Sequence, residues 1–287
     1  MILQKISNAD SGINTYIMKE AQYKMIVLDM DDTLLTDDHI ISDENKEMIF
    51  KAQEMGVYVV LASGRPTSAM TAYAKELKMD FYNSFMLSYN GAVITDLKED
   101  KILFEQTLTK EQIHELYDYS LKSKTHIITY INNEIVSETD SEYIDIEKHI
   151  TGLAHNKVVS FKDAVKTNAV KCILLEEPSY LKTVEDDLKL AMPHLSVSMS
   201  KPFFLEVAQH GIDKAFSLKK LAEQLNIHQS EIIAVGNAGN DLTMIEYAGL
   251  GVWVDTVTPE LRDKADVIVA SNNNHGVAEV IKRYILN

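Results

Sequence analysis

The sequence is poor in the residues that cross-link or interrupt a chain. Its 11 glycines and 5 prolines are too few for a fibrous or low-complexity protein. A single cysteine, Cys172, excludes an internal disulfide, which is typical of a reducing compartment, so we expect a cytoplasmic protein. Its neighbours Val170, Ile173 and Leu174 form an apolar run. This run predicts a buried thiol in a strand and argues against a nucleophilic cysteine.

Long apolar runs and an excess of positive charge are also missing. No run approaches the ~18–20 residues that cross a bilayer, and residues 1–20 lack the pattern of a signal peptide. Acidic residues number 43 against 28 basic ones, a net charge of −15. We therefore expect neither nucleic acid nor a membrane as a partner. An anionic substrate would need a metal ion or a few well-placed cations, so a basic residue inside a motif is of special interest.

From Lys24 onward, apolar runs alternate with amphipathic segments. Met25–Leu28 is continuously apolar, as in a strand buried on both faces, and Ser42 is a suitable N-cap for the helix that Gly56 ends. The pattern predicts strands at 25–28, 57–61, 85–88, 232–235, 252–254 and 267–269, with helices at 43–55, 66–78, 214–225, from 241, and to 284. This alternation predicts an α/β protein with a doubly wound, Rossmann-like parallel sheet.

The middle of the chain has a different pattern, with strand-like alternation at 126–131 and 170–174. Amphipathic helices are expected near 109–122, 140–149 and 178–191. We interpret this part as an α+β domain inserted into the first fold. The predicted organisation is an N-terminal extension (1–22), a core in two parts (23–91 and 203–287) and the inserted domain (92–202).

Three polar segments follow predicted strands of the core: Asp29 with Asp31, Ser63-Gly64, and Gly236 to Asp241. Ligands of open parallel sheets bind beyond the carboxyl ends of the strands, so we expect these segments to converge. The two aspartates fit a nucleophile and a proton donor to a leaving group, although a simple acidic turn has the same spacing.

The other candidates are equally open when each is taken alone. Ser63-Gly64 offers a hydroxyl and an amide to a phosphoryl group, or is an ordinary turn before a helix. Lys214 begins a helix, where a cation does not complement the helix dipole. It either points at a bound anion or is a solvated lysine. Asn240-Asp241 is either a helix cap or part of a metal site.

Taken together, these segments resemble the four ordered motifs of the haloacid dehalogenase (HAD) superfamily, and more narrowly the Cof-type phosphatases with a type IIB cap. The resemblance spans about residues 24–287. It rests on Asp29-Met30-Asp31-Asp32-Thr33-Leu34-Leu35, Ala62-Ser63-Gly64-Arg65, Lys214, Gly236-Asn237-Ala238-Gly239-Asn240-Asp241-Leu242-Thr243-Met244-Ile245, Ser88-Tyr89-Asn90-Gly91-Ala92 and the stretch at 271–278.

The resemblance implies a Mg²⁺-dependent phosphatase of small phosphorylated metabolites, such as a sugar phosphate, nucleotide or flavin phosphate. Asp29 would attack phosphorus to form an aspartyl-phosphate, and Asp31 would act as the acid and base. The inserted domain would be the cap that selects the substrate, in a monomer or weak homodimer. Phosphoryl oxygens would be held by Met30 (amide), Ser63, Gly64, Lys214 and Asn240, and Mg²⁺ by Asp29, Asp31 (carbonyl), Asn237 and Asp241.

The sequence departs from the family pattern at two positions. The fourth motif usually begins Gly-Asp, but here it begins Gly236-Asn237, and Ala215 replaces the usual glycine after Lys214. An amide still offers an oxygen but lacks the charge that holds a hard cation. One alternative is therefore a catalytically weakened HAD-fold protein that binds a phosphorylated ligand, and a more distant one is a phosphosugar mutase.

Overall fold

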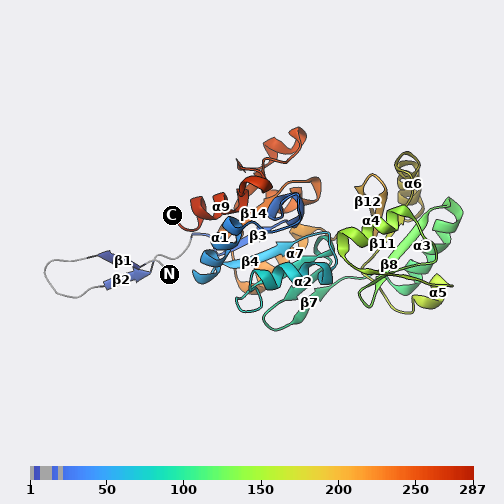
Figure 1. Ribbon diagram of the computed structural model, residues 1–287, viewed down its shortest axis with the longest axis horizontal. Helices are drawn as coiled ribbons and strands as arrows, with labels where there is room; N and C mark the ends of the chain where they lie inside the picture. The colour runs from blue at the N-terminus through green and yellow to red at the C-terminus, as the bar shows by residue number, and fades with distance from the viewer. Residues whose placement is uncertain (1–2, 7–14, 19–21) are drawn as a thin grey trace.

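The computed structural model describes residues 3–6, 15–18 and 22–287, and residues 22–287 form a core lobe and a cap lobe (Figure 1). Ahead of the core, β1 (Leu3–Ile6) pairs antiparallel with β2 (Thr15–Met18). The rest of the predicted 1–22 extension lies outside the described residues, except for residue 22. No helix in the described part of the chain has the length and apolar character needed to cross a membrane.

The core lobe is built on an eight-stranded sheet. From edge to edge its strands are β16 (Val267–Val269), β15 (Leu250–Val254), β14 (Ile232–Gly236), β3 (Met25–Leu28), β4 (Tyr58–Ala62), β5 (Phe85–Ser88), β6 (Val93–Asp96) and β7 (Lys101–Glu105). The strands from β16 to β5 are parallel, and β6 and β7 extend the sheet antiparallel. The doubly wound core is confirmed, with an antiparallel edge that makes the sheet mixed.

Helices cover both faces of the core sheet. One face carries α1 (Asp43–Glu54), α2 (Thr67–Glu76) and α9 (Gly276–Tyr284), and the other carries α7 (Lys214–Leu225) and α8 (Leu242–Tyr247). Successive residues of β3 point to opposite faces, so Ile26 and Leu28 join the first apolar cluster while Met25 and Val27 join the second. The whole strand is therefore buried, which explains its unbroken apolar sequence.

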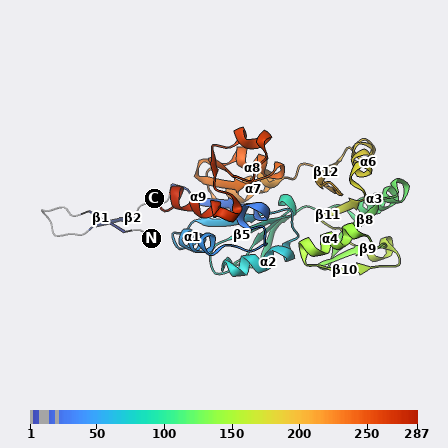
Figure 2. The ribbon, with the colours of Figure 1, turned by 45° about the horizontal axis from the view of Figure 1, so that its top comes forward.

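The cap lobe contains a six-stranded sheet in the order β10 (Ala154–Lys157), β9 (Glu134–Ser137), β8 (His126–Ile131), β11 (Lys171–Leu175), β13 (Phe204–Gln209) and β12 (Leu195–Lys201). Its helices are α3 (Lys110–Ser123), α4 (Glu142–Thr151), α5 (Phe161–Ala164) and α6 (Pro178–Ala191). Helices α3, α5 and α6 pack on one face and α4 on the other. Figure 2 shows α4 on the side of the cap sheet away from α6.

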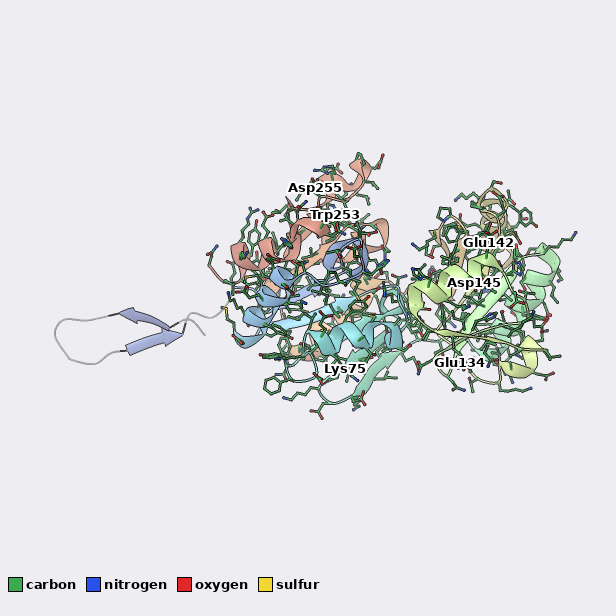
Figure 3. The ribbon with its side chains drawn as sticks, viewed as in Figure 1. Lys75, Glu134, Glu142, Asp145, Trp253 and Asp255 are labelled. Atoms are coloured by element: carbon green, nitrogen blue, oxygen red, sulfur yellow. The ribbon has the colours of Figure 1, made fainter. Side chains whose placement is uncertain are left out.

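The predicted borders of the inserted domain, 92 and 202, are wrong. Strands β6 and β7 belong to the core sheet, whereas β13 belongs to the cap sheet. Strands β6 and β7 are antiparallel, and their patterns resemble those of the cap strands. Strand β13 directly precedes the core helix α7 in the sequence, and no local pattern shows which sheet it joins. In Figure 3, Lys75, Trp253 and Asp255 lie in the core lobe, and Glu134, Glu142 and Asp145 lie in the cap lobe.

Candidate active site

The three polar segments converge at one end of the core sheet. Strand β3 lies between β4 and β14, so the residues that follow these strands become neighbours. They face a cavity of about 640 Å³ between the core and the cap. Its lining includes, from the core, Asp29, Asp31, Ser63, Gly64, Arg65, Asn90, Asn237 and Asn240, and from the cap Glu147, Lys171, Lys201, Phe204 and Glu206.

Lys214 joins two carboxylates at the base of this site. Its Nζ lies 2.6 Å from Asp29 Oδ1 and 2.6 Å from Asp241 Oδ1, and its side chain is fully buried. The first position of α7, capped by Asp213, places it there. Of the two interpretations that the sequence left open, the solvated lysine is wrong. The cation at the helix start is instead held by paired anions.

This cluster carries more negative than positive charge. Burial raises the pKa of Asp29, and so does Asp241; Lys214 opposes them, and the outcome is a pKa of about 7. Burial lowers the pKa of Lys214, but the two carboxylates outweigh that effect and raise it, so the lysine stays cationic. Two carboxylates and one ammonium leave an uncompensated charge of −1 when all three ionise. A further cation near Asp29 would relieve it.

Asp241 also organises the loop after β14. Its Oδ2 accepts the backbone N–H groups of Asn237 (3.0 Å) and Ala238 (3.1 Å). A Cβ on Gly236 would lie 2.6 Å from the Asp241 Cβ, so only glycine leaves room for this turn. Asp241 is fully buried, whereas Asn237 lines the cavity. Asn237 therefore faces the cavity, whereas the buried Asp241 holds the loop backbone in place.

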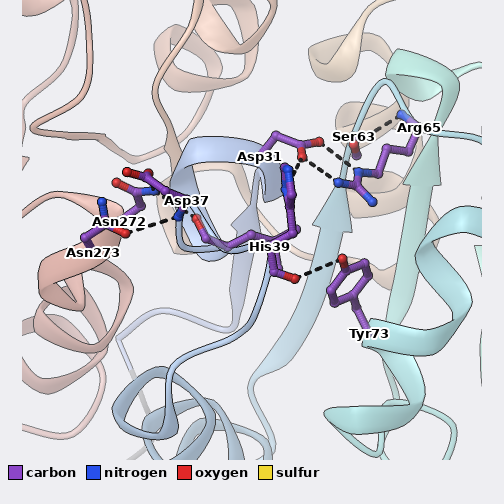
Figure 4. A network of polar contacts seen from close by, with 9 residues as sticks. Asp31, Asp37, His39, Ser63, Arg65, Tyr73, Asn272 and Asn273 are labelled. Carbon is purple, nitrogen blue, oxygen red and sulfur yellow. Dashed lines mark hydrogen bonds and ion pairs between the residues drawn. The ribbon is translucent and has the colours of Figure 1, made fainter. Parts of the chain in front are cut away.

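Asp31 is gripped by Arg65 across the site (Figure 4). The guanidinium donates to both carboxylate oxygens, Nε to Oδ2 at 2.9 Å and Nη2 to Oδ1 at 2.6 Å. Burial raises the pKa of Asp31, but the hydrogen bonds and charge of Arg65 outweigh it, helped by His39, and the pKa is lowered. Both Arg65 contacts therefore favour the carboxylate form of Asp31. Arg65 directly follows Ser63-Gly64 in the sequence. A basic residue inside a motif of an acidic chain was the pattern from which its role in the site could have been predicted.

The C-terminal stretch at 271–278 clamps the loop that follows Asp31. Asn272 Nδ2 donates to Leu35 O (3.0 Å) and Asp37 Oδ1 (3.1 Å), and Asn273 Oδ1 accepts from Asp37 N (3.1 Å). Figure 4 shows this clamp beside His39, whose Nδ1 lies 3.8 Å from Asp31 Oδ1. Residues 271–278 therefore fix the backbone at 35–37, close in sequence to His39, which lies beside Asp31.

The remaining predicted residues also lie at this end of the sheet. Ser63 is buried, and its Oγ accepts from Arg65 N at 3.2 Å. Met30 follows Asp29 at the start of the loop that closes with Leu35 N donating to Met30 O. Asn240 Nδ2 donates to Asn90 Oδ1 (3.1 Å), and the Asn90 side chain packs against Gly64.

The cap contributes a charged cluster to the cavity that sequence reasoning missed. Lys171 Nζ lies 2.8 Å from Glu206 Oε1, and Glu147 accepts a hydrogen bond from the Tyr130 hydroxyl. Burial raises the pKa of Glu147, against the charge of Lys171 and the tyrosine bond. A lysine inside the buried strand β11 was the signal that could have revealed this cluster.

The fold and site define a hydrolase of the HAD type, and comparison with known proteins agrees. Residues 26–281 match the haloacid dehalogenase-like hydrolase family, and the chain belongs to that family. A haloacid dehalogenase-like hydrolase from Bacteroides thetaiotaomicron is 36% identical, with a TM-score of 0.87 over 91% of this chain and 99% of that one.

Two further similar proteins are phosphatases by name. The 5-amino-6-(5-phospho-D-ribitylamino)uracil phosphatase YcsE of Bacillus subtilis is 29% identical, covering 93% of this chain and 98% of the relative. The HAD subclass IIB sugar phosphatase BT4131 shares the fold, with a TM-score of 0.78 at 19% identity over 91% of this chain and 98% of that one. The predicted family is confirmed: the chain is a haloacid dehalogenase-like hydrolase, and its phosphatase relatives agree with the predicted phosphoric monoester hydrolase.

Proposed function

We propose that this protein hydrolyses small phosphorylated metabolites through an aspartyl-phosphate on Asp29 and that it depends on Mg²⁺. One observation carries the proposal: Asp29 lies buried against Lys214, at the wall of a cavity whose other side is formed by the cap. A carboxylate in such a place is costly unless cations compensate it. A phosphate ester that enters the cavity would meet this carboxylate at its base.

The residues divide the chemical work. Asp29 attacks phosphorus, while Lys214, Ser63, the Gly64 and Met30 amides and Asn240 hold the phosphoryl oxygens. Asp31 gives a proton to the leaving oxygen and then takes one from the water that cleaves the aspartyl-phosphate. Arg65 must loosen its grip for Asp31 to carry that proton, because the pair favours the carboxylate. Phosphoryl transfer depends mostly on such positioning and charge neutralisation.

The donors around Asp29 fit a magnesium ion. Asp29, Asp31 and Asn237 line one cavity and offer a carboxylate, a backbone carbonyl and an amide oxygen, which are ligands that Mg²⁺ accepts together with water. Bound there, Mg²⁺ would neutralise charge on Asp29 and on the phosphoryl group. Within residues 3–6, 15–18 and 22–287, no three His, Cys, Asp or Glu side chains are grouped to hold a metal. The amide of Asn237 and the inward turn of Asp241 account for this, and they predict weak binding.

The substrate is proposed only as a class. The name of the Bacillus subtilis relative specifies a phosphorylated ribityl compound, and the cavity of about 640 Å³ has room for a molecule of that size. Sugar phosphates, nucleotides and flavin phosphates therefore remain the compounds to screen. A monomer or weak homodimer in the cytoplasm stays a prediction.

A magnesium titration with a generic aryl phosphate tests the proposal. Phosphate release should rise with magnesium and saturate, and EDTA should abolish it. Asp29→Asn should lose all activity, because an amide side chain cannot form the acyl phosphate. No release from the wild-type protein at saturating magnesium, with activity appearing in Asn237→Asp, would favour the catalytically weakened binder instead.

A further inference from the structure

The phosphate loop Ser63–Arg65 is tied down by hydrogen bonds to its three successive carbonyl oxygens. Asn90 N donates to Ser63 O (2.9 Å) and Tyr89 N donates to Arg65 O (3.0 Å), both from the core backbone. The carbonyl between them, Gly64 O, accepts from Lys171 Nζ at 3.3 Å. Lys171 belongs to the cap strand β11. One bond that fixes the loop therefore comes from the other lobe.

Lys171 is buried at the junction of the two lobes. Its side chain is 5% exposed, and Glu206, on the neighbouring strand β13, supplies the opposite charge. Its Nζ also lies 5.9 Å from the ring centroid of Tyr89 and 5.8 Å from that of Tyr130. A buried ammonium needs such partners, because leaving it uncompensated is costly.

These partners come from both lobes. Glu206 and Tyr130 belong to the cap, whereas Gly64 O and the ring of Tyr89 belong to the core. The Lys171 ammonium makes all of these contacts only when the cap lies against the core as it does here. If the lobes separated, the ammonium would lose its two core contacts, and Gly64 O would lose the bond described above.

The bond reaches the reacting groups through one peptide unit. The Gly64 carbonyl and the Arg65 N–H belong to the same peptide plane, and that N–H donates to Ser63 Oγ. A donor on the carbonyl side fixes the plane and hence the direction of the N–H. Ser63 is a proposed phosphoryl ligand, and Arg65 holds Asp31. A small rotation of this peptide would disturb both.

We propose that Lys171 is a positioning residue that couples cap closure to the phosphate loop. With the cap closed, its ammonium fixes the Gly64–Arg65 peptide, so the loop reaches its working geometry only over an enclosed substrate. Glu206 keeps the ammonium aimed at the core. The effect on turnover rests on the proposed function, whereas the effect on the loop does not.

Hydrogen exchange and steady-state kinetics of variants test this inference. Lys171→Met should speed exchange of the Gly64 and Arg65 amides. With a substrate that the wild-type protein hydrolyses, Lys171→Met should lower kcat at least about tenfold and leave KM nearly unchanged. Small misplacements of catalytic groups reduce the rate by such factors. Lys171→Arg keeps the charge and should recover part of kcat. Lys189→Met, which removes an exposed cap lysine paired with Glu185, should behave as wild type in both measurements.

The outcomes separate this inference from the proposed function. Equal exchange and equal kcat in Lys171→Met and Lys189→Met would overturn the role of Lys171. A wild-type protein that hydrolyses no phosphate ester would refute the proposed function, and the exchange comparison would still decide the inference. If Lys171→Met does not fold, Glu206→Gln takes its place: faster exchange at residues 64–65 supports the coupling and unchanged exchange contradicts it.

Discussion

Asn237 and Asp241 lie four residues apart but have opposite surroundings. Asn237 faces the cavity, and Asp241 turns inward to Lys214 and to two loop amides. The family resemblance of the sequence predicted both residues as magnesium ligands. The structure gives Asp241 a full set of protein partners, so the charge available to a metal comes from Asp29, with Asn237 as a neutral donor.

Asn237→Asp should tighten magnesium binding. A carboxylate replaces an amide beside Asp29 without a change in size, and we expect at least a tenfold lower Kd for Mg²⁺. Even the loss of a residue that only hydrogen-bonds to a metal ligand lowers metal affinity by about 10–100-fold. Calorimetric titration of both proteins with Mg²⁺ measures the difference. Asn240→Asp is a control for added charge in the same loop. An equal or higher Kd in Asn237→Asp would contradict the assignment of this position.

The raised pKa of Asp29 predicts a pH dependence of stability in metal-free protein. Its pKa is about 7 when folded against 3.8 for an unperturbed aspartate. The folded state thus binds more protons between these values, and stability should fall as pH rises from about 4 to about 7. At about 1.4 kcal/mol per unit, the loss is at most about 4 kcal/mol.

Thermal unfolding in EDTA at several pH values measures this effect. The difference in Tm between Asp29→Asn and wild type should grow with pH across the window, because the amide cannot ionise. Lys214 keeps Asp241 as a partner in the variant. A difference that does not vary with pH would show that Asp29 is ionised throughout.

At the scale of elements, the predictions succeeded where local chemistry decides the structure. The helix at 214–225 and the strands at 85–88, 126–131 and 267–269 begin and end as predicted. Ser42 caps α1 by accepting from Asn45 N. Strands whose sheet is chosen by distant partners were assigned to the wrong lobe, as β13 shows. Pairing between remote strands leaves no local pattern that names the partner.

The same limit applies to the site. Residues with a motif to mark them, such as Asp29 and Lys214, were predicted and do meet in the structure. The grip of Arg65 on Asp31 and the reach of Lys171 to Gly64 O depend on how separate elements pack. No spacing in the sequence reports such contacts.

Gly91 lies between β5 and β6 and packs against the start of α7, so its replacement should be costly. Its φ is +96°, and a Cβ there would lie 2.6 Å from Asp213 O. Asp213 caps the helix α7, which begins with Lys214. Gly91→Ala should destabilise the protein by more than the roughly 1 kcal/mol of an unfavourable backbone conformation and should lower activity. Gly152→Ala is the matched control, with φ +70° but open space around it. Denaturant unfolding compares the two, and equal losses would show that crowding at Gly91 is unimportant.

At the scale of the whole molecule, the chain crosses between the core and the cap twice. The first crossing, residues 106–109, leads from β7 to α3, and the second, residues 210–213, leads from β13 back to α7. Gln209, at the end of β13, ties them together: its Nε2 donates to Thr107 O (3.1 Å) and to Gln112 Oε1 (2.8 Å). The first crossing is also held by backbone bonds between Leu108 and Ala169. The two crossings therefore leave the core as one joined unit.

Gln209→Ala should loosen this joint with little effect on global stability. Both hydrogen bonds are partly exposed, so we expect a loss of about 1 kcal/mol or less in unfolding free energy. Cleavage by a protease at residues 106–109 should become faster, because the crossing opens more often. Gln224→Ala, at an exposed position of α7, is the control. Unchanged cleavage would mean that the backbone bonds alone hold the joint.

The position of β3 in the middle of the core sheet also constrains how the chain folds during synthesis. One neighbour, β4, follows it closely, but the other, β14, pairs Ile232 with Met25 and leaves the ribosome only after the whole cap. Until then one edge of an entirely apolar strand lacks its partner, a state prone to aggregation. The cap, whose strands are contiguous in sequence, can fold during this interval. During synthesis the first core strands are therefore most exposed to aggregation until β14, in about the last fifth of the chain, is made.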